Sequence, residues 1–370
     1  ILNNSVDNYK LSKNISYFED KKNILTFNQI LSSSSIQQKF SSLPGYGTNL
    51  GLSHSTFWFR LEIRNGQKEK YLLHLDRTWL DYITFFSKET GEWKKIETGD
   101  RLPFDTRPLN HPTFPFPLKP GSQAIYYFKI KSMDTISVPL VLYKEAAFYK
   151  KEIKIFSLII FYYGMLLVMF SYNFLIFLST RNTNYFYYCL YVSSILLYNF
   201  KTQGHAFQYL FPNNIWLQNE GWFVIPSFGG ISLSLFTTNY LKLKTEAPKL
   251  HKITKVVMYI FISVIVFPFL KPIYYELCNL TYLLILSGLA LLFLMAIIRF
   301  KQGYRPAKYY IFAFSFFVLG LGTTLFNYVG LLPDHPLFLN GGYVGSAIEM
   351  LLLSLGLADI INSLFEEKKK

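Results

Sequence analysis

Charged residues are scarce in this chain of 370 residues, and so are cysteines. Only 16% of the residues are Asp, Glu, Lys or Arg, whereas an ordinary soluble domain has roughly 25%. The two cysteines, Cys189 and Cys278, both lie in apolar runs, so the chain is not a small disulfide-held scaffold. A hydrophobic content of 51% excludes a disordered or collagen-like chain. Low charge combined with a formal net charge of +14 indicates a membrane protein whose basic residues lie at lipid surfaces.

Motifs for catalysis and for cofactor binding are missing as well. The sequence has no HExxH and no paired CxxC for zinc, and neither of the glycine-rich phosphate loops GxxxxGK[ST] and GxGxxG. No lysine lies in the apolar segment 340–362 that could hold retinal as a Schiff base. We therefore expect no catalytic residue, no metal, no cofactor and no nucleic-acid partner.

The distribution of charge divides the chain near Lys154. Residues 1–154 hold 22 of the 37 Lys and Arg and 15 of the 23 Asp and Glu. The remainder consists of long apolar runs with most of the charge in the gaps between them. We predict a β domain over residues 1–150, a membrane domain over 151–363, and the start of a cytoplasmic signalling helix over 364–370.

Seven apolar segments reach or approach the length of about 20 residues that a helix needs to cross a membrane. They are residues 155–178, 185–203, 222–241, 253–270, 275–299, 308–330 and 340–362. If the N-terminal domain lies outside, the inner loops and tail carry 13 Lys and Arg, and the outer loops carry only Lys201 and Lys271. This asymmetry predicts a seven-helix bundle with its C-terminus in the cytoplasm. A cluster of four lysines just before the first segment runs against the rule.

The first domain is predicted to be all-β. Segments rich in aromatic and β-branched residues alternate in polarity and are separated by turn signals such as Gly99-Asp100. These segments are 56–64, 70–76, 82–87, 124–131 and 136–143. Many short strands without a long amphipathic helix predict a sandwich or jelly roll.

One face of the first of these strands combines Trp58 and Arg60, opposite an apolar face that begins at Phe57. An aromatic ring beside charged groups is typical of a sugar-binding sheet, so we consider this face a candidate ligand site. Residues in or beside turns could extend it: Arg77, Trp79, Asp81, Arg107 and His111. The alternative is that the tryptophans fill the core and that the arginines pair with nearby aspartates.

Ionisable residues within a membrane span are costly and are therefore candidates for function. Glu349 lies near the middle of the seventh segment, where it could bond to a neighbouring helix in one signalling state. Asn173 and Asn327 are candidate partners, and Asp359 lies near the inner end. The alternative is a purely structural contact between helices, worth about 0.6–2 kcal/mol. Glycines in the sixth and seventh segments, among them Gly320 and Gly345, predict close packing of those two helices.

Several stretches resemble a known bacterial family. They are STFWFRLEIRN (55–65), WLDYITFF (79–86), GDRLPFDTRPLNHPTFPFPL (99–118), SVPLVLYKEAAFY (137–149) and EMLLLSLGLADIINSL (349–364). The first four are similar to the type-2 extracellular domain of the seven-transmembrane receptors with diverse intracellular signalling modules (7TMR-DISM). The last is similar to the final helix of that family's membrane domain. The resemblance covers about residues 17–363.

The resemblance implies a receptor in the bacterial inner membrane. Its outer domain would be a periplasmic jelly roll similar to carbohydrate-binding modules, so we expect a small, carbohydrate-like ligand. Family members usually continue into a kinase, cyclase or phosphatase, which here would lie beyond Lys370. A stripe of Ile360, Ile361, Leu364 and Phe365 would then seed a parallel stalk towards that effector and favour a homodimer.

Two other classes compete with the receptor. One is a transporter or channel with an outer domain, although no inverted repeat or broken helices in matched positions are visible. The other is an exported carbohydrate-active enzyme, which would need two carboxylates across a cleft.

Overall fold

The computed structural model divides the chain into two compact units. A β unit comprises residues 1–156 together with residues 200–219, and a helical unit comprises residues 157–199 and 220–370. The structure describes residues 6–43, 49–51, 53–64, 70–89, 91–107, 109–116, 123–270, 274–328, 332 and 336–369.

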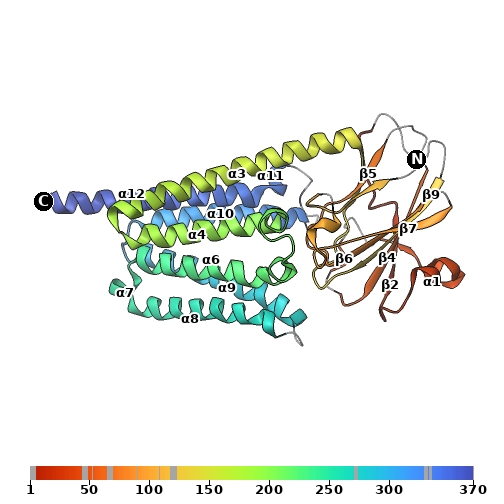
Figure 1. The fold of residues 1–370 in the computed structure, drawn as a ribbon. Coiled ribbons are helices and arrows are strands. Elements are labelled where there is room, and N and C mark those ends of the chain that lie inside the picture. Colours follow the sequence, from red (N-terminus) through yellow and green to blue (C-terminus); the bar gives the residue numbers. More distant parts are fainter. Residues whose placement is uncertain are drawn as a thin grey trace. The chain divides into compact units, whose positions relative to one another are not determined.

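The β unit is a sandwich of two antiparallel sheets (Figure 1). The four-stranded sheet has the order β1-β10-β5-β8, with β1 at Asn8–Lys10, β10 at Leu140–Lys144, β5 at Tyr71–Leu75 and β8 at Thr113–Phe116. The six-stranded sheet has the order β3-β2-β4-β9-β6-β7. Its strands are β2 (Ile15–Asp20), β3 (Ser41–Ser42), β4 (Thr56–Arg64), β6 (Tyr82–Glu89), β7 (Glu92–Thr98) and β9 (Gln123–Lys131). The predicted sandwich is confirmed.

Aromatic and aliphatic side chains from both sheets fill the space between them. On β4 the predicted apolar face is confirmed, because Phe59 and Leu61 are fully buried and contribute to this core. Phe85 of β6 packs on Phe114 of β8, with ring centroids 4.9 Å apart. The alternation of β4 places its other side chains on the outer face of the six-stranded sheet.

Two short helices, α1 (Phe27–Ser32) and α2 (Ser34–Gln37), cover part of that outer face. Thr26 and Gln29 form a capping box that starts α1. The ring of Phe27 then stacks on Phe86 at 3.9 Å and on Trp58 at 6.3 Å. A second, smaller core therefore forms outside the sandwich.

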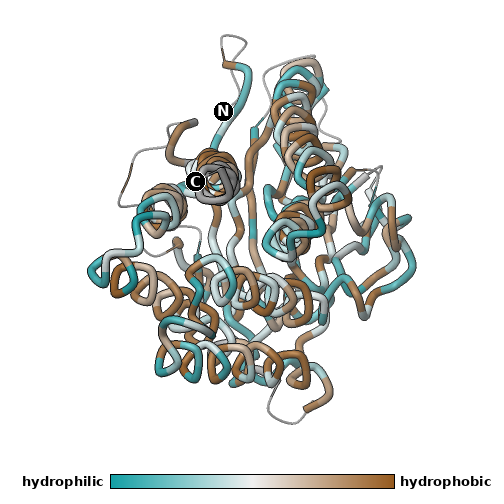
Figure 2. The backbone as a smooth tube through the Cα atoms, turned by 90° about the vertical axis from the view of Figure 1, so that its left-hand side faces the viewer, coloured by the Kyte–Doolittle hydropathy of each residue, from teal (hydrophilic) through white to brown (hydrophobic). Residues whose placement is uncertain are grey.

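The helical unit consists of long, mostly apolar helices (Figure 2). Helix α3 (Glu145–Thr180) follows β10 directly, so it begins in the β unit and ends in the helical unit. The other long helices are α4 (Thr183–Thr202), α6 (Ile215–Tyr240), α8 (Pro248–Val266), α9 (Tyr274–Lys301), α10 (Ala307–Tyr328) and α12 (Gly341–Lys369). Short helices α5 (His205–Tyr209), α7 (Leu243–Glu246) and α11 (Pro336–Leu339), with 3-10 turns η1 (Phe104–Thr106) and η2 (Phe267–Phe269), join or flank them.

Each of the seven predicted membrane segments overlaps one of these long helices. Within the described residues, six helices are long and apolar enough to cross a membrane, namely α3, α6, α8 with η2, α9, α10 and α12. Helix α4 has 20 residues, but five of them are tyrosines and its end carries Lys201. The seventh crossing therefore stays a prediction.

Helices α10 and α12 pack backbone against backbone. A Cβ atom added at Gly345 would lie 2.7 Å from the carbonyl oxygen of Phe316 and 3.1 Å from the Cα of Gly320. Only glycine permits such an approach. The predicted close packing of these two helices is confirmed.

Candidate functional site

The first predicted ligand residue, Trp58, lies inside the outer core under α1. Its side chain is completely buried and packs with Ile30, Phe86 and Tyr127. A ring with no exposed surface cannot stack on a ligand in this conformation, so the open platform expected from the sequence is wrong for Trp58. The alternative, that this tryptophan fills a core, describes its position.

Arg60, two residues further along β4, lies at the edge of a polar cleft of about 320 Å³. Its guanidinium donates to Gln37 Oε1 at 3.3 Å and pairs with Glu62 at 3.4 Å. The cleft is lined by Lys13, Asn14, Ile15, Ser16, Gln37, Phe40, Ser42, Arg60 and Glu62. It therefore offers amides, hydroxyls and both signs of charge beside one aromatic ring.

Arg77, Trp79 and His111 lie elsewhere, near the end of β5. The guanidinium of Arg77 lies 5.1 Å from the ring centre of Trp79 and donates to the carbonyl of Asp76 at 2.6 Å. His111 Nε2 lies 3.4 Å from Asp76 Oδ1, and buried His74 approaches the same oxygen at 3.7 Å. The structure thus separates this group from Arg60.

The start of α3 is fixed on this histidine group. Phe148 packs on His74 with ring centroids 5.2 Å apart, and Lys151 Nζ lies 3.5 Å from His74 Nε2. Burial lowers the pKa of His111 to about 4, although Asp76 opposes the shift. Burial acts to raise the pKa of Asp76, but His74 and the nearby positive charges outweigh it and hold that pKa well below its usual range.

Asp81 and Arg107 lie at the joint where residues 200–219, which connect α4 to α6, pack on the sandwich. We call these residues the connecting segment. Arg107 is 4% exposed and lies against the rings of both Phe104 and Phe207, with its Cζ 5.7 Å and 5.6 Å from the ring centres, and the two rings also contact each other at 5.7 Å. Phe207 belongs to the connecting segment, so the arginine fixes that segment on the β unit.

Three further hydrogen bonds attach the connecting segment to the sandwich. The Thr78 hydroxyl donates to the carbonyl of Thr202 at 2.9 Å. The Phe104 amide donates to the carbonyl of Pro212 at 3.1 Å. Asn219 Nδ2 donates to the carbonyl of Asp100 at 3.1 Å. The two ends and the middle of the segment are therefore all held.

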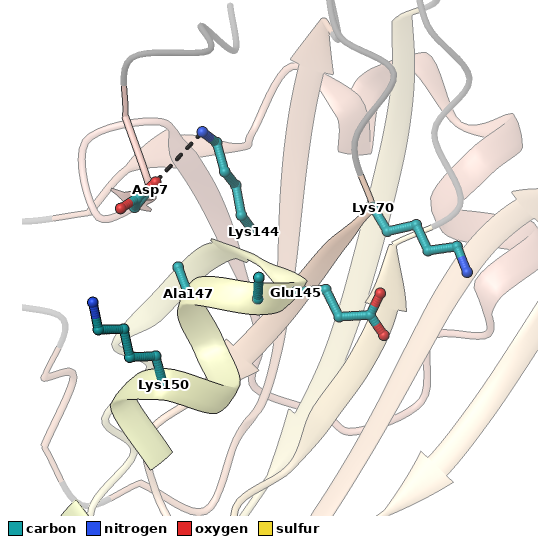
Figure 3. A pocket seen from close by; sticks show the side chains of 7 residues that line it. Asp7, Lys70, Lys144, Glu145, Ala147 and Lys150 are labelled. Carbon is teal, nitrogen blue, oxygen red and sulfur yellow. Dashed lines mark ion pairs between the residues drawn. The ribbon is translucent and has the colours of Figure 1, made fainter. Parts of the chain in front are cut away.

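A second cavity, of about 550 Å³, surrounds the first turn of α3 (Figure 3). Lys70, Lys144 and Lys150 line it, and Lys144 pairs with Asp7 at 3.4 Å. In Figure 3 the ammonium groups of Lys70 and Lys150 lie on opposite sides of the turn and do not converge. This arrangement is typical of a solvated basic surface. Among the described residues no group of three His, Cys, Asp or Glu could hold a metal ion.

In the helical unit, Glu349 is fully buried and bonds to α4. The hydroxyl of Tyr191 donates to Glu349 Oε1 at 2.8 Å, while Oε2 has no hydrogen-bond partner among the described residues. One turn along α4, the hydroxyl of Tyr188 donates to the carbonyl of Met350 at 2.8 Å. The described partner of Glu349 is thus the tyrosine Tyr191, while Asn173, one of the two asparagines considered from the sequence, accepts from Ser354 instead.

Helix α12 bonds to α3 as well. The hydroxyl of Ser354 donates to Asn173 Oδ1 at 3.1 Å, and Tyr162 and Ser346 share a hydrogen bond of 2.9 Å. Asp359 is exposed near the far end of α12. Asn327 lies in α10, but its side chain is outside the described residues. Four hydrogen bonds among the described residues therefore join α12 to α3 and α4.

Sequence reasoning missed the connecting segment and the tyrosines of α4. Residues 200–219 follow an apolar run and contain no motif, so nothing marks them as part of the β unit. For α4, the available signal was the number of tyrosines in the predicted span 185–203. Aromatic belts at the membrane surface explain such tyrosines equally well.

These features define a class of protein: a β domain that continues through α3 into a unit of helices that are long and apolar enough to cross a membrane. A family model described as 7TM diverse intracellular signalling matches residues 156–359, and one described as 7TMR-DISM extracellular 2 matches residues 12–144. The chain belongs to the 7TMR-DISM family, and it is a transmembrane sensory receptor with an extracellular N-terminal domain. No curated protein sequence matches it.

Proposed function

We propose that the extracellular β unit binds a small polar solute and that this binding changes the position of α12. The observation that carries the proposal is the identity of the helices bonded to α12. Helices α3 and α4 supply these hydrogen bonds, and α3 and the segment that follows α4 are the parts of the chain held by the β unit. A change in the sandwich can therefore reach α12 through two covalent connections.

The first connection is α3 itself. Its opening turns are fixed on His74 by Phe148 and Lys151, and the same helix carries Asn173, which bonds to α12. A helix transmits displacement along its axis because its backbone hydrogen bonds keep it stiff. Movement of the four-stranded sheet would therefore move Asn173.

The second connection is the connecting segment. It is held on the sandwich by Thr78, Phe104 and Arg107, and it continues from α4, which carries Tyr191. A ligand can shift the equilibrium between two helix arrangements only by its differential affinity for them. In our proposal the bound ligand therefore favours one position of these two attachments over another.

The polar cleft beside Arg60 is the ligand site that we propose. Its volume falls within the range of about 300–1,000 Å³ that is usual for small-molecule sites. The amides of Asn14 and Gln37, the charges of Arg60 and Glu62 and the ring of Phe40 suit a polyhydroxylated ligand. The hydroxyl groups of a carbohydrate can bond to the amides and the charged groups, and its apolar face can pack on the ring of Phe40.

The same proposal places the chain in the bacterial inner membrane, surrounded by lipid, with the β unit in the periplasm. The basic residues of the connections between helices support a cytoplasmic C-terminus. Helix α12 runs without a break to Lys369, so it would continue directly into a cytoplasmic effector or partner. A parallel pair of such helices would also support a homodimer.

The ligand part of the proposal is tested on the full chain in lipid nanodiscs. Thermal unfolding is followed with and without a panel of glucose, galactose, maltose and cellobiose. We expect at least one sugar to raise the midpoint temperature, and Arg60→Ala to remove that increase. Arg64→Ala, on the same strand but outside the cleft, should keep it. If none of the sugars has an effect, the carbohydrate class is wrong.

The coupling part is tested with spin labels at Lys252→Cys and Ala358→Cys, after both natural cysteines are replaced by serine. Pulsed electron resonance should show a sugar-dependent change in the distance between α8 and α12. Tyr191→Phe should reduce this change while the stabilisation by sugar remains. A sugar that stabilises the protein but leaves the distance unchanged would refute the coupling.

A further inference from the structure

Three carboxyl groups lie together at the joint between the sandwich and the connecting segment. Asp81 and Asp100 are each only 2% exposed, and Asp134 lies in the turn after β9. Among the described residues, Oδ1 of Asp81 and Oδ1 of Asp100 have no hydrogen-bond partner. We call these three residues the aspartate cluster.

Three cations face the aspartate cluster, and among the described residues Asp81 Oδ1 and Asp100 Oδ1 still have no hydrogen-bond donor. Arg101 Nε lies 3.3 Å from Asp81 Oδ2, which also accepts from the Met133 amide at 2.8 Å. Arg107 donates to the carbonyl of Asn110 at 3.0 Å and packs against the rings of Phe104 and Phe207. Lys201, at the end of α4, lies close enough to Asp100 and Asp134 for its charge to act on both carboxyl groups.

A buried carboxylate oxygen without a hydrogen bond is costly, because burial removes its water and nothing replaces it. A protonated carboxyl group avoids this cost and can donate to its neighbour. Neighbouring carboxylates also repel, so they do not all ionise readily. The geometry of the cluster therefore favours at least one bound proton.

The pKa directions agree with the geometry. Burial raises the pKa of Asp100 well above its usual range, and the charges of Asp81 and Asp134 add to the effect, while Arg107 and Lys201 oppose it. Burial, with Asp81, raises the pKa of Asp134 to about 6 against Lys201 and Arg101. Burial also raises the pKa of Asp81, against Arg101.

The backbone of Asp100 links the cluster to the connecting segment. Its amide donates to the carbonyl of Leu80 at 3.0 Å, and its carbonyl accepts from Asn219 at 3.1 Å. The preceding Gly99 has φ +147° and packs against the backbone of Asp81 so closely that no Cβ atom fits. A displacement of Asp100 would therefore be felt by Asn219.

We propose that the aspartate cluster is a proton-binding site whose occupancy holds the connecting segment on the sandwich, so that the receptor responds to external pH. This inference rests on the proposed function, because it takes the connecting segment as a route of signal transmission. The proton acts as a second ligand at a place distinct from the cleft beside Arg60.

The direction of the pH dependence follows from linkage. Lys201 of the docked segment lowers the pKa of Asp100 and Asp134, but burial outweighs this effect. In our proposal the docked segment contributes to that burial, so the docked state binds more protons than the released state and acidification favours docking. For Asp134, whose pKa is raised from 3.8 to about 6, loss of the whole shift on release would make the docked-to-released ratio about tenfold higher at pH 5 than at pH 7.5, and this is the upper limit because the charge of Asp81 stays on the sandwich. Protonation of His111 acts on the sandwich, on a different set of contacts.

The test uses the full chain in lipid nanodiscs with both natural cysteines replaced by serine. Spin labels at Lys88→Cys on β6 and Asn213→Cys on the connecting segment report docking in samples frozen at pH 5 and pH 7.5; both positions are exposed. We expect one short distance at pH 5 and a growing second population at pH 7.5. Asp134→Asn, which resembles the protonated form, should remain docked at both pH values.

Asp105→Asn is the matched control, since Asp105 is an exposed residue of η1 and its substitution should leave the pH dependence intact. If Asp134→Asn fails to fold, Asp100→Asn provides the same comparison. If the connecting segment of the protein with all three aspartates is fully docked at both pH values, the proposed proton site is wrong. The proposed coupling through the connecting segment would still stand. Release at every pH would instead overturn the coupling route. A pH dependence that survives both substitutions would also refute the inference.

Discussion

The backbone contact between α10 and α12 gives the sharpest prediction, because two glycines on α12 provide a matched pair. At Gly345, an added Cβ would lie 2.7 Å from the carbonyl oxygen of Phe316. At Gly342, three residues earlier, the nearest atom is Thr324 Oγ1 at 3.6 Å, which is an ordinary contact. Alanine should therefore fit at Gly342 and not at Gly345.

The magnitude follows from two opposing effects. Replacing glycine by alanine within a helix stabilises it by about 0.8–1.0 kcal/mol at either position. Relieving the contact at Gly345 requires α12 to move by several tenths of an ångström from the backbone of α10, and overpacking of this kind costs about 1–3 kcal/mol. We therefore expect the free energy of unfolding of Gly345→Ala to be about 1–3 kcal/mol below that of Gly342→Ala.

The two natural cysteines provide the assay. Cys189 and Cys278 are both buried in the helical unit, so a maleimide dye that fluoresces on reaction with thiols reports its unfolding. For a unit of about 190 residues, each kcal/mol shifts the midpoint by about 2–4 °C. Gly345→Ala should melt roughly 2–12 °C below Gly342→Ala. Equal midpoints, or a higher one for Gly345→Ala, would refute the reasoning from close approach.

Three other predictions follow from single groups. Tyr191→Phe removes the hydroxyl that donates to Glu349 and should lower the free energy of unfolding by about 1–2 kcal/mol in the same assay; Tyr187→Phe should not, and equal losses would contradict the role of the bond. Trp58→Ala should destabilise the β unit by about 3–5 kcal/mol in urea unfolding, since it empties a buried site; a folded variant of normal stability would contradict the core position. The folded pKa of His111, about 4, is below its unfolded value, so stability should fall by up to about 3 kcal/mol as pH drops from 6.5 to 4; His111→Gln should flatten that part of the profile, and an unchanged slope would assign it to other groups.

The general architecture could be predicted from the sequence because it depends on local patterns. Alternation along residues 56–64 defined which face of β4 enters the core, and glycine spacing predicted the contact between α10 and α12. Charge distribution predicted a boundary near Lys154, and the helical unit begins at Ser157. Short elements such as β3 and β7 were not predicted, because two to seven exposed residues carry little hydrophobic pattern.

The site was harder to predict because it depends on pairs of residues that are distant in the sequence. Glu349 could be selected as a costly buried carboxyl, but its partner Tyr191 lies 158 residues away and has no distinguishing pattern. Trp58 alternates in register with Arg60 as expected, yet the small helix α1 covers it. An alternating strand shows which side chains share a face, not what packs on that face.

The membership of residues 200–219 in the β unit has a consequence for how such receptors can be taken apart or recombined. A soluble fragment ending near Phe156 would uncover Arg107 and Phe104, which the connecting segment packs against in the whole chain. If only the residues before α3 were exchanged for those of a relative, the new sandwich would likewise have to pack on the connecting segment of the original protein. The β unit is therefore discontinuous in the sequence, and we expect a working chimera to need residues 1–156 and residues 200–219 from the same protein.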